Sequence, residues 1–132
     1  TGSVHAPDEL RDLAEVCRKY EVIVISDEIY ALINFGKQAF EGIANYYPEG
    51  TITISGISKA FSAGGWRLGF AMIPDDLKEI TRPLSAFVSE TFSCVSAPVQ
   101  YAVLPAFDNY WSVKKHVELC RNIHGAAGKY FF

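Results

Sequence analysis

The sequence contains an uninterrupted run of four β-branched residues, Val22-Ile23-Val24-Ile25. Such a run is typical of a strand buried on both faces, because a strand with one face in water alternates apolar and polar residues. Strands of this kind occur in sheets that helices cover on both sides. The run therefore predicts an α/β fold.

Further strands and helices are predicted on either side of this run. Residues 51–54 and 68–73 form two more apolar, β-branched or aromatic segments, and Pro74 stops the second. The link between them is Gly- and Ser-rich and barely long enough for the crossover that parallel neighbours need, so we expect the third strand to be antiparallel. Helix signals predict helices over residues 7–17, 75–88 and 96–107, and from Trp111 onward. The expected fold class is α/β, part of a mostly parallel sheet flanked by helices, with one antiparallel strand.

Composition and charge exclude several classes of protein. Of the 132 residues, 49% are hydrophobic and 20% are charged, which is a globular and not a disordered composition. The net charge is −3, no dense basic stretch suggests a nucleic-acid surface, and no apolar run approaches the length of a membrane helix. The three cysteines are widely spaced and the three histidines are scattered, so we expect neither a disulfide framework nor a metal site.

Polar residues follow the first two predicted strands directly. Ser26-Asp27-Glu28-Ile29-Tyr30 comes after the first, and Ser55-Gly56-Ile57-Ser58-Lys59 comes after the second. Gly64-Gly65-Trp66-Arg67 follows a few residues later. Because ligands of open α/β sheets bind at the carboxyl ends of the strands, we expect these groups to face a shared crevice.

The side chains in these segments suit one cofactor, pyridoxal phosphate (PLP). A buried carboxylate, Asp27, can stabilise a protonated pyridine nitrogen, and the phenol of Tyr30 can hydrogen-bond the 3-oxygen. The amine of Lys59 can form a Schiff base with the aldehyde, and Arg67 can bind the phosphate. Taken singly, each also has an ordinary structural role: an exposed lysine, a capping aspartate, a packing tyrosine or an ion-pairing arginine.

Together, these three segments resemble the class I/II aminotransferases, PLP enzymes of fold type I related to aspartate aminotransferase. The resemblance covers residues 1–107 and rests on Ser26–Tyr30, on Ser58-Lys59, and on Gly65-Trp66-Arg67-Leu68-Gly69, in the order and approximate spacing of that family. Thr1-Gly2 also resembles the end of the family's Asn-Pro-x-Gly motif. The fold implied is the three-layer large domain of these enzymes.

The resemblance assigns a role to each candidate site residue. Lys59 is the catalytic residue, which holds PLP as a Schiff base and, once freed, moves a proton between the substrate α-carbon and the cofactor. Asp27 pairs with the pyridinium, Tyr30 contacts the 3-oxygen, and Arg67 binds the phosphate.

One position departs from the family's pattern. Many members carry a phosphate-binding serine three positions before the lysine, where this chain has Gly56. Ser58 and Ser55 are the alternatives as a source of that hydroxyl, and we favour Ser58.

The implied reaction is transfer of an amino group from an amino acid to a 2-oxo acid, by a cytoplasmic homodimer without nucleic-acid or membrane partners. Two alternatives remain open: a PLP-dependent carbon–sulfur lyase, and the non-enzymatic PLP-binding effector domain of a transcription regulator.

Both ends of the chain look like cuts. We expect all 132 residues to be the central part of a large domain, without the upstream phosphate loop and the downstream small domain, and therefore to be inactive in isolation.

Overall fold

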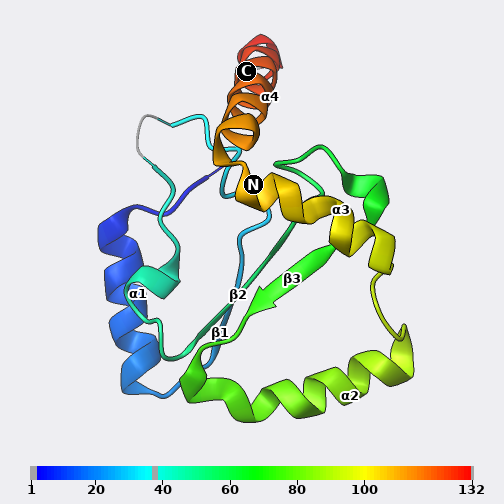
Figure 1. Ribbon diagram of the computed structural model, residues 1–132. Helices are drawn as coiled ribbons and strands as arrows, with labels where there is room; N and C mark the ends of the chain where they lie inside the picture. Colours follow the sequence, from blue (N-terminus) through cyan, green and yellow to red (C-terminus); the bar gives the residue numbers. More distant parts are fainter. Residues whose placement is uncertain (1–2, 37–38, 132) are drawn as a thin grey trace. The chain divides into compact units, whose positions relative to one another are not determined.

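The computed structural model describes residues 3–36 and 39–131 (Figure 1). The predicted Thr1-Gly2 motif lies outside these residues. The chain divides into two units, and each is described by itself. The first takes its described residues from Thr1–Glu28, Phe40–Ser55 and Phe70–Cys94, and the second from Ile29–Ala39, Gly56–Gly69 and Val95–Phe132.

A three-stranded sheet has the order β1-β2-β3, with β1 at Val24–Asp27, β2 at Thr51–Gly56 and β3 at Gly69–Met72. β1 and β2 are parallel, with Val24 opposite Thr51 and Asp27 opposite Ile54. β3 runs back along β2: the N–H of Ile57, just after β2, donates to the oxygen of Leu68, just before β3 (3.2 Å). Figure 1 shows the β3 arrow pointing towards the next element along the chain, the 3-10 helix η3 (Asp75–Ile80). The α/β class and the antiparallel third strand are confirmed.

Helix α1 spans Pro7–Lys19 and supplies one side of the core of the first unit. Proline in the first turn and the acidic residues Asp8 and Glu9 there suit the start of a helix, where free N–H groups point outward. Its buried residues pack against Ile43 of η1 (Ile43–Asn45), Tyr47 and Val24; they are Leu10, Ala14 and Cys17. Leu13 also lies at helical spacing from Leu10 but is 47% exposed, because it lies at the edge of the buried stripe.

The prediction that β1 is buried on both faces is wrong. Val24 packs against the α1 core, but Ile25 is 67% exposed, and Val22 and Ile23 precede the strand and are also exposed. Exposure alternates along β1, because no described segment of the first unit covers the face that carries Ile25. The continuous run thus identified the strand but not its environment.

The helix predicted over residues 75–88 forms as two separate elements. Residues 75–80 form a 3-10 helix, η3 (Asp75–Ile80), and only then does α2 (Thr81–Thr91) begin. Pro83 gives the reason, because proline lacks an N–H group and is tolerated only in the first turn of an α-helix. An α-helix starting at Asp75 would have placed Pro83 in its interior.

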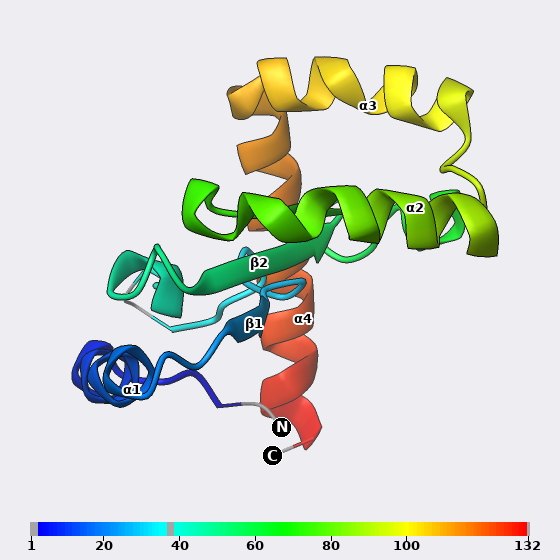
Figure 2. The same ribbon diagram turned by 90° about the horizontal axis from the view of Figure 1, so that it is seen from below.

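In the second unit, α3 (Ala97–Asp108) packs against α4 (Tyr110–Phe131). Figure 2 shows α3 lying across the start of α4. Both helices begin within one residue of their predicted starts. The core of this unit consists of Ile57, Leu68 and Val103, with Phe61, Ala63, Val95 and Val99 packed around it. The segment after β2 is therefore fixed by α3.

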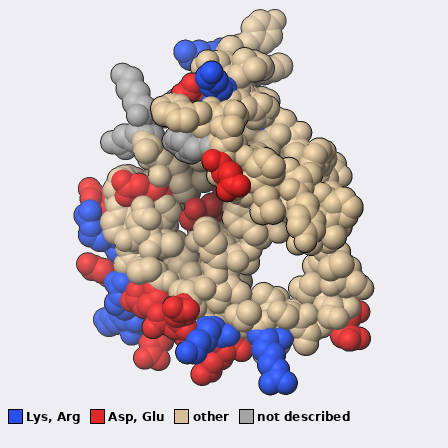
Figure 3. Space-filling view, in the orientation of Figure 1, with Lys and Arg blue, Asp and Glu red and all other residues tan. Residues whose placement is uncertain are grey.

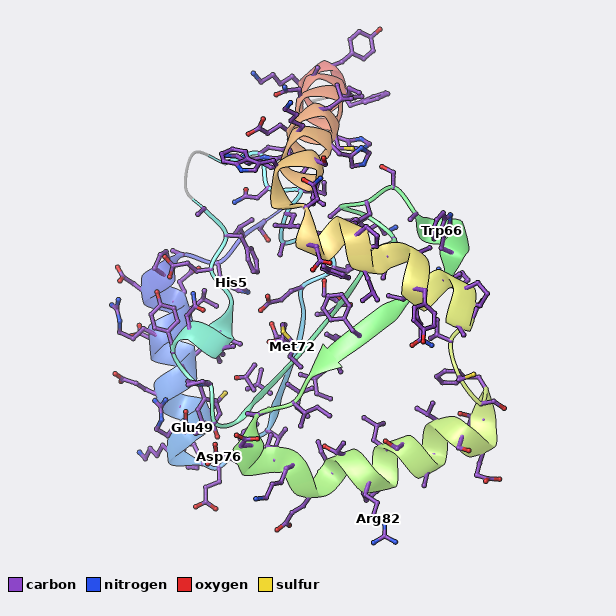
Figure 4. All side chains as sticks on the ribbon, viewed as in Figure 1. His5, Glu49, Trp66, Met72, Asp76 and Arg82 are labelled. Atoms are coloured by element: carbon purple, nitrogen blue, oxygen red, sulfur yellow. The ribbon has the colours of Figure 1, made fainter. Side chains whose placement is uncertain are left out.

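Charged side chains gather over α1 in the first unit (Figure 3). Arg18 Nε donates to Glu49 Oε1 (2.6 Å), and Arg18 Nη2 donates to the oxygen of Tyr46 (2.6 Å). Figure 4 shows Glu49 beside α1. The hydrogen bond from Arg18 holds the pKa of Glu49 below its ordinary value of 4.5 and raises the pKa of Arg18.

This pair predicts a loss of stability in acid. Because the pKa of Glu49 is lower in the folded chain, its contribution to stability is present above pH 4.5 and is lost as the pH falls through the folded pKa. The loss is expected to be modest, since the two side chains are 46% and 41% exposed. Urea unfolding between neutral pH and about pH 3 measures it. Glu49→Gln should flatten this part of the profile, and identical profiles for the two proteins would contradict the assignment.

Candidate active site

Lys59 lies in a tight turn that follows β2 in the second unit; this turn, residues 57–63, is called the lysine turn below. Ile57, at 1% exposure, anchors the start of this turn in the core. The N–H of Ser62 donates to the oxygen of Lys59 (3.1 Å), and the N–H of Ala63 donates to the oxygen of Ile57 (3.3 Å). The side chain of Lys59 itself is exposed. The fold therefore presents this amine to solvent from a backbone that is held in place.

Tyr30 and Lys59 lie together, as the sequence predicted. Lys59 Nζ lies 5.3 Å from the centroid of the Tyr30 ring, within the range of a cation–π contact. Tyr30 is 59% exposed and lies in a turn in which its oxygen accepts from the N–H of Ile33 (2.8 Å). Within the described part of the chain, no carboxylate forms an ion pair with Lys59. The amine and the phenol are thus both open to a ligand.

Arg67 follows the 3-10 helix η2 (Gly64–Trp66) of the same unit. It has a left-handed backbone conformation, φ 52° and ψ 50°, which is uncommon for residues other than glycine and typical of functional or tightly held positions. Its Nη1 donates to the oxygen of Gly64 (2.9 Å). A guanidinium carries five N–H donors, so this bond orients the side chain and leaves donors for an anion. The adjacent Trp66, marked in Figure 4, is half exposed.

Asp27 lies at the carboxyl end of β1 in the first unit, opposite Ile54. The strand end is held by the N–H of Glu28, which donates to the oxygen of Ile54 (2.9 Å). The expectation of a buried carboxylate is wrong: Asp27 is exposed. It alternates with Ser26 and shares the uncovered face of β1 with Ile25.

Gly56 has no room for the serine that many aminotransferases carry there. A Cβ atom at this position would lie 2.8 Å from the oxygen of Leu68 and 3.1 Å from the Cα of Gly69. Both are backbone atoms of the neighbouring segment, so they cannot rotate away. Glycine in place of serine at position 56 therefore fits the close approach of Leu68 and Gly69 to this position.

The two alternative serines differ in their contacts. Ser55 Oγ donates to the oxygen of Glu28 (3.4 Å). Ser58 is half-buried in the lysine turn, and its hydroxyl has no hydrogen-bond partner among the described residues. This difference favours Ser58 as the hydroxyl available to a ligand.

One set of contacts at the lysine turn was not predicted. Ser62, also in a left-handed conformation (φ 53°), contacts His116 and Cys120 of α4. The spacing of His116 and Cys120, four residues apart on a helix, was the available signal. The contact of Ser62 with these two residues could be found only from the tertiary structure, because Ser62 lies more than 50 positions before them.

No helix among the described residues combines the length and apolar character needed to cross a bilayer. No group of three His, Cys, Asp or Glu side chains among them is arranged to hold a metal ion.

Known proteins resemble this chain in sequence and in structure. The family model for aminotransferase class I and II matches residues 1–131. The aspartate aminotransferase of Geobacillus stearothermophilus is 36% identical over 110 residues, which are 81% of this chain and 27% of the relative. The curated relatives that this chain matches are much longer. The chain spans less than a third of their length, for example 28% of one and 27% of another.

Two solved structures superpose well on the chain. A double mutant of Thermus thermophilus aspartate aminotransferase gives a TM-score of 0.84 at 30% identity, covering 92% of this chain and 31% of that one. The aromatic aminotransferase of Pyrococcus horikoshii gives 0.81 at 32% identity, covering 92% and 32%. With a family model that matches nearly every residue, the chain belongs to the class I and II aminotransferases.

Proposed function

We propose that the protein containing this chain is a PLP-dependent aminotransferase that moves an amino group from an amino acid to a 2-oxo acid. The observation that carries the proposal is the exposed Lys59 amine, held on an anchored turn 5.3 Å from the Tyr30 ring. Family membership supports the reaction class. Several relatives are named aspartate aminotransferases, so aspartate is the first amino donor to test.

The donor set of the second unit fits PLP. The cofactor has an aldehyde, a 3-hydroxyl and a phosphate, and this unit offers an amine, a phenol, a hydroxyl and a guanidinium. Lys59 would bind the aldehyde carbon, Tyr30 would donate to the 3-oxygen, and Arg67 with Ser58 would bind the phosphate. Gly64 O already orients the guanidinium of Arg67 (2.9 Å). For Asp27 of the first unit, the role of pairing with the protonated ring nitrogen rests on the family resemblance alone.

When bound, PLP supplies a ring that withdraws electrons from the bond to be broken. The chain's own residues would position the cofactor and move the proton. Once freed from the cofactor, Lys59 Nζ would accept a proton from the substrate α-carbon and later return one, as a general base and acid. In the role that the resemblance gives it, Asp27 would keep the ring nitrogen protonated through its negative charge. Tyr30 would hold the 3-oxygen, and Arg67 would neutralise phosphate charge and help to fix the position of the ring.

The same proposal extends to the organisation of the protein. Residues 1–132 are the central part of a large, PLP-binding domain, and the whole protein is a cytoplasmic homodimer, as the family resemblance implies. Alone, the 132 residues bind PLP weakly and do not turn over substrate. Transamination by the 132 residues in isolation would contradict this last statement.

Borohydride reduction in the presence of PLP tests the cofactor site. Reduction makes a lysine–PLP bond permanent, and peptide mass spectrometry then locates it. We expect the label on Lys59 at least about tenfold above Lys19, a matched control because its Nζ also lies 5.3 Å from a tyrosine ring, that of Tyr20. Equal labelling of the two lysines, in the chain and in the longer protein, would refute the site.

The reaction is tested separately on the longer protein that contains this chain, with aspartate and a 2-oxo acid as substrates. Formation of a new amino acid supports transamination. Release of ammonia together with loss of a β-sulfur substituent would favour the lyase instead.

A further inference from the structure

Three polar side chains of the second unit converge beside the lysine turn. Ser62 Oγ lies 3.1 Å from His116 Nε2 and 3.6 Å from Cys120 Sγ, and that sulfur lies 3.4 Å from the same nitrogen. His116 and Cys120 are one turn apart on α4 and therefore share a face. Their donor atoms and the hydroxyl oxygen form a nearly equilateral triangle.

The size of this triangle suits a metal ion. Ligand atoms at the usual ~2.0–2.3 Å from Zn²⁺, with tetrahedral angles, lie about 3.3–3.6 Å from one another. The three observed separations fall within or close to this range. Thiolate and imidazole are also the ligands that zinc and related thiophilic ions prefer. The side chains would need little movement to bind such an ion.

Access and proton balance are compatible with binding. Ser62 and His116 are exposed, whereas Cys120 is 9% exposed, so an ion can enter from the solvent side and meet the sulfur behind. On binding, the Cys120 thiol loses its proton to solvent and the thiolate donates to the metal. His116 binds through the Nε2 lone pair and keeps its proton on Nδ1.

We infer that Ser62, His116 and Cys120 form a binding site for a thiophilic divalent metal ion, of which Zn²⁺ is the representative. Cys120 and His116 are the two strong ligands, the Ser62 hydroxyl is a weak third, and water completes the tetrahedron. No third His, Cys, Asp or Glu joins them among the described residues, so the site is weaker than a structural zinc centre and is not required for folding. This inference does not depend on PLP binding.

Cobalt titration tests the site directly. Co²⁺ replaces Zn²⁺ in tetrahedral sites, and a thiolate ligand gives it a charge-transfer absorption band. We expect one equivalent of Co²⁺ to produce this band, to release one proton per chain, and to be displaced by Zn²⁺. The band should persist in the double variant Cys17→Ser/Cys94→Ser, which keeps only Cys120.

The ligand variants decide the assignment. Cys120→Ser should abolish the band, and His116→Gln should weaken Co²⁺ binding at least about tenfold. His116 is exposed, so its variant carries the test even if Cys120→Ser loses its helical circular dichroism. Absence of the band in the unmodified chain would overturn the inference. So would a band that survives Cys120→Ser, or an affinity unchanged by His116→Gln.

Discussion

Replacing Lys59 with alanine is expected to abolish the borohydride-stable PLP label and to lower kcat of the longer protein by about 10²–10⁴-fold, the usual range for loss of a general acid–base group. The lysine is proposed both to bind the cofactor carbon and to move the α-proton, and no other amine shares its turn. Steady-state transamination assays and mass spectrometry of the reduced protein measure the two losses separately.

A second variant separates charge from proton transfer. Lys59→Arg keeps the positive charge beside Tyr30, but a guanidinium does not lose its proton at working pH. We therefore expect kcat to fall as far as in Lys59→Ala. Lys19→Ala removes a lysine with the same aromatic contact and should leave kcat unchanged. Activity retained by Lys59→Arg would show that the proton is moved by another group.

The largest effect on stability is expected at Ile57, the residue that anchors the lysine turn. Ile57 is 1% exposed and packs with Leu68 and Val103. Truncation to alanine removes buried methyl and methylene groups and leaves a cavity, at a cost of about 2–5 kcal/mol, whereas Ile57→Val should cost about 0.5–1.5 kcal/mol. Denaturant unfolding followed by circular dichroism measures both values.

The matched control is Ile25→Ala on β1, where the side chain is 67% exposed. Because little apolar surface is removed from the interior, this change should stay within about 0.5 kcal/mol. Ile57→Ala should also reduce PLP labelling of Lys59, since the backbone of its turn is fixed through Ile57. Equal destabilisation by the two alanine variants would show that the lysine turn is not anchored in the core.

The fold class and most elements were predictable because their signals are local. Proline and acids open α1, and β-branched runs mark β1 and β2. The short Gly-rich link between β2 and β3 indicated an antiparallel pair, which the strand ends confirm. The division of one predicted helix into η3 and α2 also has a local cause, in Pro83, which the periodicity of apolar residues did not register.

Burial was predicted less well, because it depends on what lies opposite each residue. The run in β1 indicated a strand buried on both faces, but Ile25 and Asp27 share an uncovered face. Leu13 fits the helical period of α1 but lies at the edge of its stripe. A periodic pattern gives the direction of a side chain along its own element, whereas exposure is set by neighbours distant in sequence.

By itself, the sequence determined the family and the identity of the candidate groups, because family motifs are defined by residue type and spacing along the chain. Only the tertiary structure brought Lys59 to the ring of Tyr30, left no space for a Cβ atom at Gly56, and gathered Ser62, His116 and Cys120 around one point. The physical reason is that the contacts of Lys59 with Tyr30, of Gly56 with Leu68 and of Ser62 with His116 each join residues a dozen or more positions apart. Such contacts arise from packing around Ile57 and along α4, which local propensity does not encode.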